Sequence, residues 1–190
     1  MTASSHIRKS FLPSLFVVLF ILGMTTELQA QRRYRVGYKD AGFSGIIEGA
    51  ALFPSNTYNL AFNLDVILGM QVNANIFVGG GIGLDAYESD LFSTVFVDAR
   101  YFFIADQFTP FFFLDAGYAL PIDINPNISG GPMVNPGVGI KYFFTKTVGL
   151  NLSVAYRFQS MPINTDNPDG SVALKTNWIQ SPNLRLGIQF

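Results

Sequence analysis

The chain has 190 residues, no Cys and one His, with 12 Lys and Arg against 13 Asp and Glu. Hydrophobic residues make up 49% of the chain and charged residues only 13%, against about 25% charged residues in ordinary soluble domains. This composition excludes intrinsic disorder, which requires low hydrophobicity and high net charge. It also excludes a strongly basic nucleic-acid-binding surface, disulfide bonds and Cys-ligated metals.

The beginning of the sequence has the pattern of a secretory signal peptide. Arg8 and Lys9 precede an apolar stretch over residues 11–24, and Ala30 is a small residue at the expected cleavage position. The apolar stretch is too short for a membrane-spanning helix, which needs about 20 residues. We therefore expect residues 1–30 to be a signal peptide.

An alternative interpretation of this segment is a buried N-terminal helix. Pro13 and Gly23 interrupt the segment, and it has no amphipathic stripe, so the helix is the weaker interpretation. Cleavage after residue 30 would remove His6, the only histidine. The expected mature domain, residues 31–190, would then contain neither His nor Cys.

Apolar and polar residues alternate through the rest of the chain. In one such segment, Leu60, Phe62 and Leu64 share a face, whereas Asn63 and Asp65 lie on the other. A period of two is typical of a β-strand with unlike faces. The segments are longer than the usual strand of about 5–6 residues and match the alternating segments of about 10 residues in membrane barrels. Eight of them are found, at about 42–53, 59–71, 76–86, 92–103, 112–120, 134–144, 150–158 and 184–190.

The connections between these segments alternate in length. They are short around residues 73–75, 106–107 and 145–147, and longer at 121–132 and 160–177. Short turns at one end and longer loops at the other are typical of outer-membrane barrels. We therefore predict an all-β fold, an eight-stranded antiparallel up-and-down transmembrane β-barrel, with its longer loops outside the cell.

The composition of the polar face indicates which face points outward. A water-exposed exterior needs many long charged or amide side chains, but this face carries mostly Gly, Ala, Ser, Asn and Asp, including Gly79, Gly81 and Gly83. Small residues suit a crowded interior. The other face is apolar from end to end, as contact with lipid requires. A soluble barrel or sandwich with an apolar core remains the alternative.

The last segment carries the most specific local motif. Leu184, Leu186 and Ile188 alternate with Arg185 and Gly187 up to Phe190, the final residue of the sequence. This pattern resembles the C-terminal assembly signal of outer-membrane β-barrels.

Taken together, the chain resembles small outer-membrane barrels of the OmpA/OmpX kind. The resemblance implies residence in the outer membrane among its lipids and lipopolysaccharide. It also implies insertion by the barrel-assembly machinery and a monomeric state.

Two motifs resemble binding sites but lack the necessary context. Residues 81–86 match GxGxxA, yet no helix pattern follows to hold a pyrophosphate. Residues 165–176 loosely resemble a calcium loop, but Thr176 stands where the bidentate Glu belongs. We therefore predict no cofactor and no metal site.

Charged residues fall near the middle of several predicted strands, on the polar face. Because the first and last strands are neighbours in a closed barrel, Arg185 is expected to pair with Glu48, and by the same argument Arg100 with Asp115. Such pairs would plug the barrel, since a charge in a narrow interior needs a partner. The predicted interior charges are Glu48, Asp65, Asp98, Arg100, Asp115 and Arg185.

Three functions are compatible with these patterns. The favoured one is a non-enzymatic envelope, adhesion or surface-binding role through the extracellular loops, because a histidine-free chain lacks the usual proton shuttle of an enzyme. A lipid-modifying outer-membrane enzyme is the second, and would require a carboxylate pair. A soluble periplasmic ligand-binding barrel is the third. Eight strands enclose little more than their own side chains, so a general porin is not expected.

Overall fold

A computed structural model describes residues 41–55, 60–88, 90–122, 129–145, 147–166 and 172–190. The expected signal peptide lies outside the described residues. Eight strands make up the described part of the chain, and their number agrees with the sequence pattern. They are β1 (Gly42–Leu52), β2 (Ala61–Asn73), β3 (Ile76–Ala86), β4 (Leu91–Phe102), β5 (Phe108–Pro121), β6 (Gly131–Phe143), β7 (Gly149–Asp166) and β8 (Val172–Gln189).

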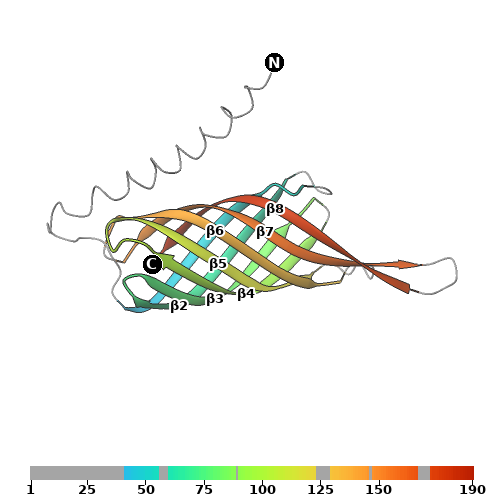
Figure 1. Ribbon diagram of the computed structural model, residues 1–190, viewed down its shortest axis with the longest axis horizontal. Helices are drawn as coiled ribbons and strands as arrows, with labels where there is room; N and C mark the ends of the chain where they lie inside the picture. Colours follow the sequence, from blue (N-terminus) through green and yellow to red (C-terminus); the bar gives the residue numbers. More distant parts are fainter. Residues whose placement is uncertain (1–40, 56–59, 89, 123–128, 146, 167–171) are drawn as a thin grey trace, which may run out of the picture. The chain divides into compact units, whose positions relative to one another are not determined.

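The strands form a closed barrel in which each pairs with its neighbour in sequence and β1 pairs with β8 (Figure 1). All pairs are antiparallel. The connections after β2, β4 and β6 lie at one end of the barrel, called here the turn end. Those after β1, β3, β5 and β7 lie at the other, called the loop end. The predicted fold class is therefore confirmed.

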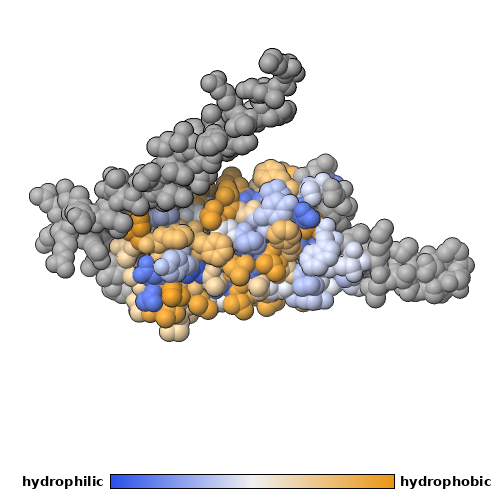
Figure 2. Space-filling view, in the orientation of Figure 1, coloured by the Kyte–Doolittle hydropathy of each residue, from blue (hydrophilic) through white to orange (hydrophobic). Residues whose placement is uncertain are grey.

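Apolar side chains cover the outside of the barrel. Leu64, Val97 and Leu186, for example, are 53%, 58% and 54% exposed, although each lies within a strand paired on both sides. Figure 2 shows hydrophobic residues over much of the visible wall. An apolar surface of this extent is stable only in contact with lipid or another apolar partner. No helix in the described part of the chain has the length and apolarity needed to cross a membrane.

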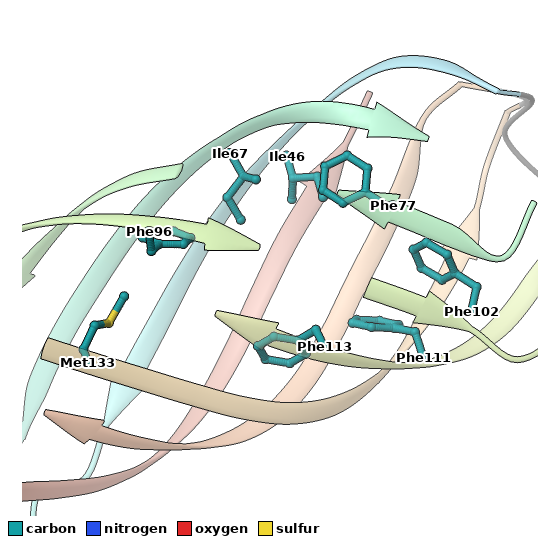
Figure 3. Packing of buried hydrophobic residues seen from close by; sticks show 8 residues of the cluster. All are labelled: Ile46, Ile67, Phe77, Phe96, Phe102, Phe111, Phe113 and Met133. Carbon is teal, nitrogen blue, oxygen red and sulfur yellow. The ribbon is translucent and has the colours of Figure 1, made fainter. Parts of the chain in front are cut away.

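Large aromatic side chains fill part of the interior. Phe96 and Phe102 occupy positions of β4 that alternate with the outward apolar residues, and they point inward with 3% and 2% exposure. Figure 3 shows them with the other members of one interior cluster. A second apolar cluster includes Leu52 of β1, Phe92 of β4 and Met161 of β7. These residues lie toward the loop end of the barrel. The interior therefore has aromatic and apolar layers as well as polar ones.

Glycines opposite the rings make room for them. Phe96, Phe111 and Phe113 each have a glycine as direct cross-strand partner, namely Gly81, Gly139 and Gly137. A Cβ atom at any of these glycines would collide with the ring opposite. These inward glycines are therefore required by the rings opposite them, which the alternating pattern alone does not reveal.

The longest predicted loop is wrong. Residues 160–177 were expected to be loop because they are rich in Pro, Asn and Asp, but most of them continue β7 and β8. The two strands pair in unbroken register as far as Asp166 and Val172. Cross-strand pairing there overrides the weak strand propensity of the individual residues. The result is a two-stranded hairpin that continues beyond the barrel wall (Figure 1).

The ladder between β6 and β7 is interrupted beside Pro136. Pairing runs through Val134 and resumes at Gly137, without partners for the two residues between them. Proline has no N–H to donate to a neighbouring strand. The β6–β7 boundary therefore has fewer backbone bonds at this level than the rest of its length.

Candidate functional site

The strand alternation directs nine charged side chains of the described residues into the barrel interior, called the lumen. Each is at most 2% exposed. Charges removed from water require partners, because an isolated buried charge costs several kcal/mol. These residues are Glu48, Asp65, Asp85, Asp98, Arg100, Asp115, Lys141, Arg157 and Arg185.

Arg185 of β8 is the centre of the lumen network. Its Nη2 atom lies 2.9 Å from Glu48 Oε2 and 2.8 Å from Asp65 Oδ2. Its Nη1 atom lies 2.6 Å from Asp115 Oδ2. The three carboxylates come from β1, β2 and β5, so one guanidinium joins four strands across the lumen. The Arg185 guanidinium also lies over the face of the Phe113 ring, with its carbon 4.9 Å from the ring centroid.

Arg100 of β4 forms the second hub. Its Nη1 atom lies 2.7 Å from Glu48 Oε1, and its Nε and Nη2 atoms donate to the carboxylate of Asp98 at 2.8 to 3.0 Å. The rings of Phe111 and Phe113 lie 5.7 and 5.6 Å from its guanidinium carbon, close enough for cation–π attraction. Glu48 therefore receives both arginines.

The structure brings all six predicted interior charges together, with one change of partner. Arg185 and Glu48 form the expected ion pair. The expected pair between Arg100 and Asp115 is wrong, since within the described barrel Arg100 contacts Glu48 and Asp98, and Asp115 contacts Arg185. The long Arg100 side chain reaches across the lumen to β1 instead of to the adjacent strand.

A further ion pair, between Arg157 and Asp85, was not predicted from the sequence. Arg157 of β7 donates to Asp85 of β3 at 2.6 Å. Both residues stand on the polar face in the alternating pattern, but β3 and β7 are not neighbours, so adjacency gave no reason to join them. Asn63 links this pair to the network, because its Nδ2 atom donates to both Asp65 and Asp85 at 2.7 Å.

Lys141 lies nearer the turn end, apart from the arginines. Its Nζ atom donates to Gln189 Oε1 at 2.7 Å and lies 3.5 Å from the ring centroid of Phe102. The ring of Phe143 is 4.8 Å away. A small hollow at this end is lined by Lys141, Phe102, Phe143 and Gln71 among others. The cation is thus held by an amide and two aromatic faces.

Two glycines allow the carboxylates to sit so close to the wall. A Cβ atom at Gly187 would collide with Glu48, and a Cβ atom at Gly83 would collide with the carboxylate of Asp65. Both glycines stand on the inward face of their strands. Larger residues there would displace the acids that the arginines bind.

The final residue closes the barrel at the pairing of β1 and β8, called the closing seam. Phe190 N donates to Gly45 O, and Gly45 N donates to Phe190 O, both at 2.9 Å. The Phe190 ring covers Gly45, since a Cβ atom there would lie 2.6 Å from Phe190 Cε2. Inside the seam, Gln189 donates to Ser44 Oγ at 2.8 Å. The terminal strand is therefore anchored on both faces of the wall.

The described interior has the chemistry of a packed support. Each of the five buried carboxylates contacts an arginine, which occupies the acids in ion pairs. Among the described residues, no group of three or more His, Cys, Asp and Glu side chains is arranged to hold a metal ion.

Comparison with known proteins defines the fold. No family model and no curated protein matches the chain. Among solved structures, Neisserial surface protein A matches with a TM-score of 0.59 and 16% identity over 80% of this chain and 98% of its own. The outer membrane protein OprG from Pseudomonas aeruginosa matches with a TM-score of 0.53 and 12% identity, over 81% and 98% of the two chains.

A third match shows that this fold does not decide activity. The outer membrane enzyme PagL matches with a TM-score of 0.51 and 13% identity, over 75% of this chain and 97% of its own. An enzyme and proteins not described as enzymes thus share the architecture. The closed barrel, its apolar outer wall and these likenesses show that the chain has the eight-stranded up-and-down β-barrel fold of these outer-membrane proteins.

Proposed function

We propose that the chain is a non-enzymatic outer-membrane protein that binds surface partners through its loop end, above all through the β7–β8 hairpin. The observation that carries this proposal is the continuation of both strands past the wall. The last backbone bonds from neighbouring described segments are Ser129 N to Pro162 O and Ser55 N to Gln180 O, at 2.9 and 3.0 Å. Beyond them the hairpin is paired only with itself among the described residues.

The packed lumen supports this proposal over a transport function. A residue that lines a water-filled channel is accessible to water, but the inward side chains of the described wall are buried from Ser44 to Gln189. The wall then serves as an anchor, and binding is left to the segments outside it. The ion pairs that engage every buried carboxylate likewise favour a structural role over a catalytic one.

The proposal includes the steps that bring the barrel to its place. Residues Leu184, Leu186, Ile188 and Phe190 would serve as the signal for the barrel-assembly machinery, and the folded protein would stand as a monomer among lipid and lipopolysaccharide. The alternation of these four apolar residues and the anchoring of Phe190 at the closing seam support this assignment.

The transport function can be tested in planar bilayers. We expect the purified barrel to insert without stepwise conductance, because the charged network and the two apolar clusters fill its lumen. A general porin reconstituted in the same way serves as the control for detection. Conductance of porin size would contradict the anchor proposal.

The hairpin can be shortened without disturbing the wall. Ile163 and Lys175 are cross-strand partners beyond the last contact with the wall, so an Asn-Gly turn in place of residues 164–174 closes the hairpin there. We expect this variant to keep its heat-modifiable gel mobility. We also expect intact cells that produce it to lose attachment to collagen-coated and bare polystyrene surfaces.

A matched control shortens residues 123–128 between β5 and β6 and should keep attachment. Full attachment by the hairpin variant would place the binding function elsewhere. Mass spectrometry of lipid A from the same cells tests the enzyme alternative, which requires a modified lipid that disappears with the protein.

A further inference from the structure

The described lumen contains an unequal number of opposite charges. Five carboxylates face four cations, and all nine are buried. The excess of one negative charge is expensive in a low-dielectric interior unless a cation or a proton neutralises it. The position of the acids shows where a proton would be held.

Asp98 and Asp115 stand directly opposite each other. They are cross-strand partners on β4 and β5, and both point into the lumen with 0% and 1% exposure. Side chains of directly opposite residues in an antiparallel pair lie close together, with Cβ atoms about 4.5–5.5 Å apart, so the two carboxyl groups are neighbours in the lumen. Two ionised carboxylates cannot hydrogen-bond, because neither has a hydrogen to donate, and like charges directly opposite each other destabilise a sheet.

The surrounding groups leave one acceptor atom for this contact. Asp115 Oδ2 accepts from Arg185 and Asn135 at 2.6 and 2.9 Å, whereas Asp115 Oδ1 has no donor among the described residues. Both oxygens of Asp98 accept from Arg100. A hydrogen between the two acids would satisfy Asp115 Oδ1.

Among the described residues, the two arginines beside the pair do not fully neutralise both acids, because other carboxylates share them. Arg100 also binds Glu48 of β1, and Arg185 also binds Glu48 and Asp65. On the outer sides of the pair, β3 presents Gly79 opposite Asp98, and β6 presents Asn135 opposite Asp115. The two arginines are thus shared among four carboxylates.

We propose that Asp98 and Asp115 share one proton in the folded barrel, which makes the lumen network electrically neutral. The pair is then an acid–carboxylate hydrogen bond built into the wall. Because the folded barrel holds one more proton than the unfolded chain at neutral pH, its stability falls as the pH rises. The lumen charge becomes a pH-sensitive element of the fold.

Infrared spectroscopy of the protein folded in detergent tests the proposal. At about pH 6.5 the exposed carboxyl groups are ionised, so we expect the carbonyl band of a single protonated acid from the lumen. Asp98→Asn and Asp115→Asn should each remove this band. Asp65→Asn is the matched control, since it alters another buried acid that Arg185 binds, and should retain it.

A second measurement follows stability against pH. The wild-type barrel should lose resistance to guanidinium as the pH rises from about 5 to 7, and Asp98→Asn should remove this dependence because its amide donates the hydrogen permanently. Heat-modifiable mobility verifies that each variant is folded. Absence of the acid band in the wild-type protein would overturn the proposal even if no variant folds, as would a band lost only in Asp65→Asn.

Discussion

Replacing Arg185 with Leu is expected to cost more stability than any other single change in the lumen. The substitution leaves Glu48, Asp65 and Asp115 without the guanidinium that all three contact. Breaking a buried ion pair by removing one partner costs about 3–5 kcal/mol. Guanidinium unfolding of the barrel in detergent measures the loss, which should reach or exceed this range.

Two comparisons give this prediction a specific form. Arg157→Leu leaves only Asp85 without an ion-pair partner and should cost less than Arg185→Leu. Adding Glu48→Ala to Arg185→Leu should recover part of the loss, because it removes one of the three acids that had contacted Arg185. Strictly additive losses in this double-mutant cycle would contradict direct coupling of the two residues.

Deletion of Phe190 is expected to prevent most of the protein from reaching the outer membrane in folded form. The deletion removes two backbone hydrogen bonds with Gly45 at the closing seam and uncovers that glycine. Each hydrogen bond contributes about 0.5–1.5 kcal/mol net, which alone would leave much of the barrel folded. The larger expected effect is on assembly, through the proposed terminal signal.

Fractionation and refolding separate these two effects. The deleted protein should be depleted from the outer-membrane fraction, yet should still refold in detergent with a modest decrease in stability. Phe190→Tyr keeps the aromatic ring and serves as the matched control, which should assemble normally. Normal outer-membrane levels of the deleted protein would show that Phe190 has no part in an assembly signal.

Alternation was sufficient to predict the strand number, the closed topology and the inward polar face. It works because a residue in this wall meets either lipid or the lumen, and successive residues alternate between the two. Even the irregular Phe96 and Phe102 obey the alternation, since their rings are part of the lumen packing. The pattern identified six of the nine described inward charges for the same reason, and it missed Asp85, Lys141 and Arg157 although they stand on the same face.

The partners of those charges depend on geometry that the pattern does not contain. Strand adjacency suggests contacts between neighbours, but Arg100 and Arg157 reach strands on the other side of the lumen.

The hairpin was missed for a different reason. Pro162 and Pro182 are typical of loops, yet each occupies a paired position opposite Thr176 and Tyr156, because an edge or interrupted ladder tolerates a missing N–H.

The interlocking of rings and glycines restricts how this sequence can diverge. A larger residue at Gly137 becomes acceptable only when Phe113 opposite it becomes smaller, and the same holds for Gly81 and Phe96. Single substitutions at either member are disfavoured in both directions, by collision or by an unfilled space. We therefore expect substitutions on the inner wall to be coupled between opposite positions of adjacent strands. Apart from the Phe190–Gly45 contact, we expect the exposed apolar positions of the outer wall to exchange Leu, Ile and Val more independently.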